Sequence, residues 1–314
     1  MNVEIVPNAK SCQLGEGPHW SSTEGVLYYV DIPRGRVLRY DPLDGGSCNF
    51  VDIDGGKDPV SFVIPSIKEK EFLIGKGRDL CRLQWDFKQN DGPKLVKMVE
   101  VDVEFRDNRF NDGKCDFMGR LWAGTMGKAL LSPNDIKRYQ GSMYLFCQNP
   151  NDLNRAIVDC KFDKVHISNG LDWSPDGKTM YYIDSLTRKI DGFDFDAKNG
   201  SLENRRTVFD LSGHLGKDGF PDGMTIDTKG HLWVACWGES QILKIDPVGE
   251  EVLSKITFHG MATNITSCTF GGPELKDLYV TSALDSEGKG GQLFVIRNTG
   301  AQGLAGRSFD PTFV

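Results

Sequence analysis

Residues 180–184 read MYYID, and after a short turn residues 189–195 read KIDGFDF. Both segments are rich in aromatic and β-branched residues and are bounded by Asp, Ser and Gly, which is typical of two strands joined by a hairpin. The same pair returns in five further places: 26–30 with 36–40, 71–75 with 80–85, 121–124 with 142–146, 232–236 with 241–246, and 278–281 with 292–296. The sequence therefore predicts an almost wholly β protein built from repeated hairpins.

A short segment ending in a turn precedes each of these hairpins. The units begin near positions 17, 60, 111, 170, 223 and 266, and their spacings are 43, 51, 59, 53 and 43 residues. Six units of this length indicate a propeller or an array. A closed ring is favoured because it hides sheet edges and uses many glycine turns, and glycine takes 36 of the 314 positions. We predict one all-β domain over residues 1–314, a six-bladed β-propeller, with two separate sandwiches as the alternative. Only residues 133–139 look helical.

Composition and charge exclude several classes of protein. The net charge is −7 and is spread along the chain, which argues against nucleic acid or a membrane surface as a partner. No stretch approaches the length of an apolar membrane span, and the N-terminus lacks the pattern of a secretory signal. The eight cysteines include no C-x-x-C pair, so we expect reduced, packed thiols. These features favour a cytoplasmic protein with a small-molecule partner, either a monomer or a weak oligomer.

Oxygen-bearing side chains recur at one phase of the repeat. In a propeller the innermost strand of each blade starts near the central channel, and aligning the units places Glu16, Asn111, Asn169 and Asp222 at or beside that position. Buried unpaired carboxylates are costly, so such a cluster implies a cation or extensive hydrogen bonding. Oxygen ligands suit calcium, magnesium or manganese. The competing interpretation is that Asn-Gly and Asp-Gly form ordinary turns and that Glu16 is a surface charge.

Other catalytic patterns are absent from the sequence. The five histidines lack zincin spacing, and there is no G-x-S-x-G elbow, P-loop or dinucleotide fingerprint. His19 follows Gly-Pro and is expected to be a packed residue rather than a ligand. Residues 172–178 resemble a calcium loop in composition but lack its later glutamate, so a blade hairpin is the better interpretation.

Four blocks of sequence resemble the signatures of the senescence marker protein-30 family, which comprises regucalcin, gluconolactonase and firefly luciferin-regenerating enzyme. The blocks are LGEGPHW at 14–20, NRFNDGK at 108–114, SNGLDWS at 168–174 and PDGMTID at 221–227. The resemblance covers nearly the whole chain and implies a six-bladed propeller. It also implies that Glu16, Asn169 and Asp222 bind one divalent metal ion, calcium first, with zinc, magnesium or manganese as alternatives. Arg109 and Asn111 match the substrate-contacting pair, and Asp222 also matches the general base.

These matches lead to one primary hypothesis and two alternatives. The primary hypothesis is a metal-dependent lactonase that hydrolyses a sugar lactone, as a gluconolactonase does. The alternatives are a non-catalytic calcium-binding protein of the regucalcin type, and a luciferin-regenerating or other ester hydrolase on the same site. Asp112 is expected either to orient Arg109 or to form an Asp-Gly turn.

One segment departs from the pattern of the family. Regucalcins carry paired acidic residues just after Gly-Thr-Met, and one of these contacts the sugar. Here that stretch is Gly127-Lys128-Ala129, which has no carboxylate and adds a positive charge. The loss of this sugar contact weakens the expectation of gluconolactone itself as the substrate, and a less polar or an anionic ring substrate is the alternative.

Overall fold

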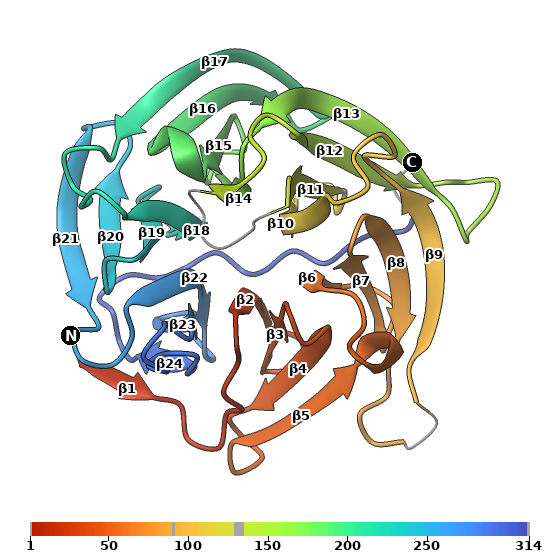
Figure 1. Cartoon of the computed structure of the whole chain (residues 1–314), viewed down its shortest axis with the longest axis horizontal. Coiled ribbons are helices and arrows are strands. Elements are labelled where there is room, and N and C mark those ends of the chain that lie inside the picture. The colour runs from red at the N-terminus through yellow and green to blue at the C-terminus, as the bar shows by residue number, and fades with distance from the viewer. Residues whose placement is uncertain (1, 90–91, 129–134, 313–314) are drawn as a thin grey trace.

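Six four-stranded antiparallel sheets surround a central axis like the blades of a propeller (Figure 1). The computed structural model describes residues 2–89, 92–128 and 135–312. Five sheets take their strands in chain order, from the innermost strand outward. The prediction of an all-β, six-bladed β-propeller is confirmed.

The first three of these sheets are formed by β2 (Gly15–Ser21), β3 (Val26–Asp31), β4 (Arg36–Asp41) and β5 (Ser47–Asp52); by β6 (Val60–Pro65), β7 (Glu71–Lys76), β8 (Asp79–Gln84) and β9 (Lys94–Glu100); and by β10 (Arg109–Cys115), β11 (Leu121–Met126), β12 (Gly141–Gln148) and β13 (Ala156–Val165). The next two are formed by β14 (Ser168–Trp173), β15 (Thr179–Asp184), β16 (Lys189–Asp196) and β17 (Ser201–Asp210); and by β18 (Phe220–Ile226), β19 (Leu232–Trp237), β20 (Gln241–Asp246) and β21 (Glu251–Thr257). Two short 3-10 helices connect strands: η1 (Ile53–Gly55) and η3 (Ser185–Thr187).

The sixth sheet joins the two ends of the chain. It consists of β22 (Asn264–Gly271), β23 (Asp277–Ala283), β24 (Phe294–Ile296) and, on its outer edge, β1 (Val3–Ile5). Val3 pairs with Ile296 and Ile5 with Phe294 in an antiparallel register. The first strand therefore completes the last blade and closes the ring, as Figure 1 shows.

The core is divided among the six contacts between neighbouring blades. Each contact holds one large apolar cluster of buried side chains. Between the fifth and sixth blades, Trp233 meets Phe270 edge to face, with ring centroids 5.4 Å apart. Between the second and third blades, Phe62 meets Phe110 at 5.5 Å. The second strand of each blade is buried along almost its whole length, as in β3 and β11, and this burial explains the hydrophobic runs of the repeats.

Every innermost strand carries an irregularity at the same place. The pairing register with the second strand shifts between Glu16 and His19 in β2, and at the equivalent position in β6, β10, β14, β18 and β22. Such bulges increase local twist and re-aim side chains, and they often lie beside functional sites.

The glycines in these bulges permit close approach between neighbouring inner strands. A Cβ on Gly223 would lie 2.1 Å from Ser267 Oγ, and one on Gly170 would lie 2.7 Å from the Met224 nitrogen. Asn169-Gly170 and Asp222-Gly223 therefore lie inside strands β14 and β18. The alternative interpretation of these dipeptides as hairpin turns is wrong.

The C-terminal segment crosses the far mouth of the ring as a strap, seen in blue in Figure 1. Gly303 forms a bridge with Asp227 of the fifth blade. Phe309 donates its backbone N–H to the Pro65 carbonyl in the second blade, at 2.8 Å. Asp310 donates to the Gly119 carbonyl in the third blade, at 2.9 Å. These partners all follow the ends of inner strands, so the strap closes the mouth opposite to the strand starts.

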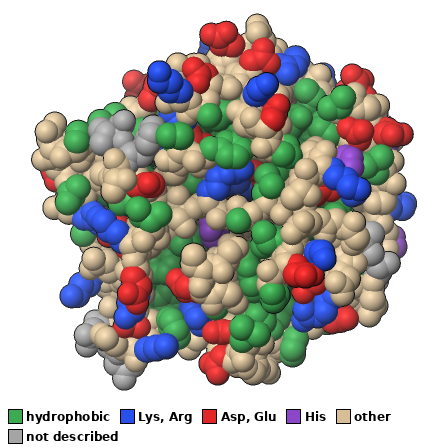
Figure 2. All heavy atoms as spheres, turned by 180° about the vertical axis from the view of Figure 1, so that it is seen from behind, with side chains coloured by type: hydrophobic (Ala, Val, Ile, Leu, Met, Phe, Trp, Pro, Cys, Tyr) green, Lys and Arg blue, Asp and Glu red, His purple; other side chains and the backbone are tan. Residues whose placement is uncertain are grey.

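Other sequence predictions have mixed outcomes. Residues 172–178 form the end of β14 and the turn into β15, as predicted. Pro133 and Asn134, the start of the expected helical segment, lie outside the described residues, and residues 135–140 contain no α-helix. All eight cysteines are free. In the part of the chain that the structure describes, no helix is long and apolar enough to cross a membrane. Figure 2 shows acidic and basic side chains interspersed over one face of the ring.

The strap offers a direct test of how much it stabilises the ring. Phe309 is buried at 2% exposure between the second and third blades, so Phe309→Ala should lower the free energy of unfolding by about 3–5 kcal/mol. Leu43→Ala is the control because Leu43 is 83% exposed, and it should change stability by less than about 0.5 kcal/mol. Urea denaturation measures both. An equal decrease in the free energy of unfolding of the two variants would contradict a stabilising role for the strap.

Candidate functional site

The bulges of four inner strands bring the predicted site residues to one mouth of the channel. Glu16 lies in β2, Asn169 in β14 and Asp222 in β18, and all three are buried. Arg109 and Asn111 lie in β10 and are half-buried. The charges of Glu16, Asp222 and Arg109 act on one another, because the structure gathers these side chains around the axis.

The two carboxylates are held in an environment that disfavours their charge. Burial raises the pKa of Glu16 well above its usual range, and the neighbouring charges of Asp222 and Asp112 raise it further. Burial and then Asp112 likewise raise the pKa of Asp222. Arg109 opposes both shifts, and burial lowers its own pKa to about 10, so the guanidinium stays protonated at neutral pH. Like charges buried together call for a cation beside them.

The amide of Asn169 has an acceptor without a protein partner. Its Nδ2 donates to Ser185 Oγ at 2.9 Å, which fixes the orientation of the amide. Its Oδ1 is buried and accepts no hydrogen bond. The Asn169 side chain also hydrogen-bonds Asp222, so this amide lies beside that carboxylate. An unpartnered amide oxygen is a ligand that a hard divalent cation accepts. Ser185 belongs to η3, a connection that does not recur in the other units, so the sequence carried no signal for this contact.

The candidate ligand set contains few ionisable groups. Among the described residues, no group of three or more His, Cys, Asp or Glu side chains is arranged to hold a metal ion. The set at this mouth has two carboxylates, from Glu16 and Asp222, and its third oxygen is the amide of Asn169. Such a set leaves coordination positions for water or substrate.

Asn111 holds Arg109 in place. Arg109 Nη1 donates to Asn111 Oδ1 at 2.7 Å and to the Phe110 carbonyl at 2.8 Å. Asn111 Nδ2 in turn donates to the Ser168 carbonyl in the fourth blade, at 2.8 Å. Asp112 accepts the backbone N–H of Gly113 at 2.7 Å within β10. Asn111, rather than Asp112, therefore orients the guanidinium, and Asp112 lies in a strand rather than a turn.

The second and sixth blades place short hydroxyl side chains at the corresponding positions of their inner strands. Ser61 Oγ donates to the Phe110 carbonyl of the third blade, and Thr266 Oγ1 donates to the Gly15 carbonyl of the first blade, each at 2.6 Å. Our sequence analysis missed both residues. Their signal was their position at the same phase of the second and sixth units.

Deeper in the channel, a lysine closes the space below the carboxylates. Lys114 Nζ donates to Asp172 Oδ2 at 2.7 Å and to the Met224 carbonyl at 3.0 Å. Arg307 of the strap lies 3.6 Å from the other oxygen of Asp172. His19 is buried nearby, and burial lowers its pKa to about 4, as expected for a packed, neutral side chain. The strap covers one mouth of the channel, and we call the opposite mouth, at the starts of the inner strands, the open mouth.

The segment that departs from the family pattern borders the open mouth. Lys128 Nζ lies 4.0 Å from Asp107 Oδ1, in the connection before β10. Gly127 is buried and packs near Lys137, while Ala129 lies outside the described residues. The added positive charge therefore stands at the rim of the site.

The fold and site together define a class: six-bladed propellers with an oxygen-rich pocket at one mouth of a closed channel. Residues 14–284 match the family described as SMP-30/Gluconolactonase/LRE-like region, and the chain belongs to that family. It is 36% identical over 317 residues to regucalcin of Xenopus laevis, and the alignment covers 98% of each chain.

Two solved structures have the same architecture. A luciferin-regenerating enzyme superimposes with a TM-score of 0.88 and 33% identity, over 98% of this chain and 99% of that one. A protein from Agrobacterium tumefaciens, described as a calcium-binding regucalcin, gives a TM-score of 0.82 at 23% identity, over 97% and 96% of the two chains. The second likeness shows the fold alone. The resemblance seen in the sequence blocks is confirmed.

The electrostatics of the site predict an unusual effect of neutralising one carboxylate. Because the pKa of Asp222 is raised, the metal-free folded protein holds protons that the unfolded chain releases above about pH 4, so its stability falls as pH rises. Asp222→Asn should therefore stabilise the metal-free protein at about pH 8 by about 1–2 kcal/mol. Thermal unfolding in a chelator measures this change. The control, Asp218→Asn, alters an exposed residue and should have little effect. A lower unfolding temperature of Asp222→Asn would contradict the conclusion that burial raises the pKa of Asp222.

Proposed function

We propose that this protein is a metal-dependent lactonase that hydrolyses a small cyclic ester of the sugar-lactone type. The observation that carries the proposal is the buried set of Glu16, Asp222 and the unpartnered Oδ1 of Asn169 beside the guanidinium of Arg109. Membership of a family that includes gluconolactonases supports a hydrolytic role. The proposed substrate is a small molecule that enters at the open mouth.

The proposed metal ligands are the two carboxylates and the amide oxygen. Glu16, Asn169 and Asp222 would hold one divalent ion, with calcium first because all three donors are oxygen. Water or substrate would fill the remaining coordination positions. A bound divalent ion supplies Lewis-acid polarisation of the ester carbonyl and makes water more acidic.

The protein's own residues divide the remaining tasks. Asp222 lies among the proposed metal ligands, and its carboxylate would accept the proton of the attacking water. Arg109 offers further N–H donors to the developing negative charge on the ester oxygen. Asn111 holds the guanidinium through the 2.7 Å bond described above, so its role is positioning. Ser185 fixes the Asn169 amide with its oxygen free.

Two other functions use the same site. Regucalcin is the name of the Xenopus relative, and a calcium-binding protein without turnover would need the same oxygen ligands. The likeness to a luciferin-regenerating enzyme, at 33% identity, points to a second alternative, an ester hydrolase with another substrate. Assays with oxyluciferin and with a phosphotriester, beside the lactone, test this alternative. Metal binding without hydrolysis of any of these would favour the first alternative. Preference for oxyluciferin or the phosphotriester would favour the second.

The lactonase proposal predicts a dependence on both the metal and Asp222. A pH-indicator assay with glucono-δ-lactone and a series of calcium, manganese, magnesium and zinc should show hydrolysis that a chelator abolishes. Asp222→Ala should lower kcat by about 10²–10⁴-fold, because it removes both a ligand and the base. Asp218→Ala, an exposed neighbour, is the control. Hydrolysis that survives both chelation and Asp222→Ala would refute the proposal.

Metal binding has its own signature in the pH dependence of stability. The carboxylates must lose their protons to bind a cation, so calcium should raise the unfolding temperature more at about pH 8 than at about pH 5. At about 100 times the Kd, the stabilisation should reach about 2.7 kcal/mol. Glu16→Gln should lose most of this effect, and Glu104→Gln, on an exposed loop, should keep it. An unchanged calcium shift in Glu16→Gln would remove Glu16 from the ligand set.

A further inference from the structure

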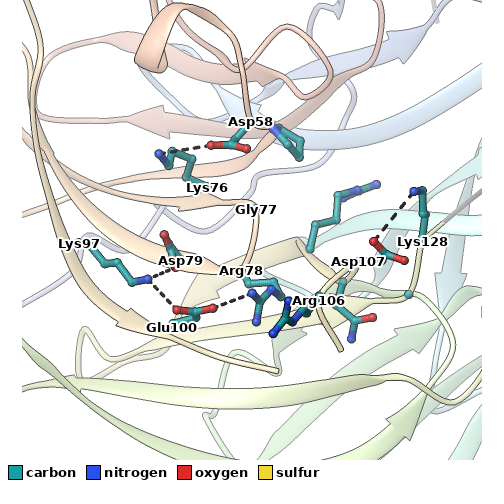
Figure 3. Close-up of a pocket in the computed structure, with 14 residues that line it drawn as sticks. Asp58, Lys76, Gly77, Arg78, Asp79, Lys97, Glu100, Arg106, Asp107 and Lys128 are labelled. Atoms are coloured by element: carbon teal, nitrogen blue, oxygen red, sulfur yellow. Dashed lines mark hydrogen bonds and ion pairs between the residues drawn. The ribbon is translucent and has the colours of Figure 1, made fainter. Parts of the chain in front are cut away.

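A cavity of about 670 Å³ opens beside Arg109 at the same mouth of the ring (Figure 3). Its walls are the connection before β6, the turn between β7 and β8, the connection before β10, and the residues that follow β11. Arg109 lines this cavity and also bonds to Asn111 in the candidate site. Arg109 is thus common to the cavity and to the candidate site.

The lining of the cavity is more basic than the chain as a whole. Six Lys and Arg residues and four Asp and Glu residues line it, although the net charge of the protein is −7. On its outer side the charges cancel. Lys97 Nζ lies 2.8 Å from both Asp79 and Glu100, and Arg78 lies 2.7 Å from Glu100. Lys76 lies 3.4 Å from Asp58. Three of the four carboxylates are thus already paired with bases.

The side of the cavity nearest the candidate site keeps an excess of positive charge. Arg109 donates to three neutral acceptors, the Phe110 carbonyl, the Asn111 amide and Ser61 Oγ. The carboxylates of Glu16 and Asp222 act on its charge from the candidate site, so the excess positive charge comes from the other two bases, Arg106 and Lys128. Arg106 is exposed and has no carboxylate within 4 Å among residues 2–89, 92–128 and 135–312. Lys128 has only Asp107, at 4.0 Å, and Asp107 is shared with Lys137 at 3.4 Å. Figure 3 shows Asp107 joined to Lys128 at one end of the cavity, with Arg106 nearer to Arg78.

We infer that this cavity binds an anionic oxygen group, a phosphate or a second carboxylate, carried by the substrate whose ester lies at the metal ligands. This inference rests on the proposed function. Guanidinium groups present a planar fork that matches oxyanions, and an ammonium adds a point charge. A neutral sugar lactone would leave Arg106 with no counter-charge among the described residues, and Lys128 with only Asp107, which Lys137 shares.

Binding of open-chain sugar acids to the calcium-loaded protein tests the inference without turnover. Isothermal titration calorimetry would compare gluconate, 6-phosphogluconate and glucarate, which share a chain and differ at the far end. We expect the phosphate or the second carboxylate to tighten binding at least about tenfold over gluconate. A tighter 6-phosphogluconate assigns a phosphate, and a tighter glucarate assigns a carboxylate.

Variants separate a specific contact from the general field of the protein. The preference should disappear in Arg106→Gln with Lys128→Gln. It should persist in Lys217→Gln with Lys229→Gln, which removes the same charge from exposed or half-exposed positions in another part of the ring. The inference would be overturned if the three acids bind equally, or if neither 6-phosphogluconate nor glucarate binds. It would also be overturned if the preference survives in the double variant Arg106→Gln with Lys128→Gln. Equal loss of the preference in both double variants would overturn it as well.

The two proposals fail in different ways. If the lactone assay shows no hydrolysis while 6-phosphogluconate or glucarate binds tightly through Arg106 and Lys128, the anion site stands and the lactonase proposal falls. If lactones are hydrolysed and the three acids bind equally, the lactonase stands and the anion site falls.

Discussion

The close approach of the six inner strands is the constraint on which the rest of this structure depends. At the bulge in β14 and β18 there is room for glycine and for no larger residue, because a Cβ would meet the neighbouring strand at 2.1–2.7 Å. Ser61 and Thr266 use the same proximity to bond to the backbone of the next blade. Strand β1 then completes the sixth sheet, so the ring cannot open at one blade without losing contacts at both sides.

This proximity also explains the electrostatic character of the site. Residues adjacent to the bulge glycines are forced toward the axis, and there Glu16 and Asp222 lose most of their water. Two desolvated carboxylates destabilise a folded protein unless a cation accompanies them. The six apolar clusters between blades stabilise the ring and offset this cost. The stability of the protein therefore comes from the contacts between blades, and the candidate chemistry is confined to the axis.

The open mouth has chemically different sectors. Met126, Ile136 and Ile167 form a small apolar cluster at the third and fourth blades. The second and third blades instead present the basic cavity beside Arg109. The Glu16 carboxylate, the Asn169 amide and the Asp222 carboxylate come from the inner strands of the first, fourth and fifth blades. A substrate that enters this mouth therefore meets positive charge on one side and oxygen ligands at the axis, and its orientation follows from that asymmetry.

The sequence by itself determined the number of blades and the residues that reach the axis, because hydrophobic hairpins repeat six times and Glu16, Asn111, Asn169 and Asp222 share one phase of the repeat. It did not distinguish a turn from a strand at Asn169-Gly170, since that choice depends on Met224 in the neighbouring blade. Nor did it find Ser185 behind Asn169, or the cavity that Arg106 and Lys128 both line. Those contacts join segments with no regular spacing along the chain, and only closure of the ring brings them together.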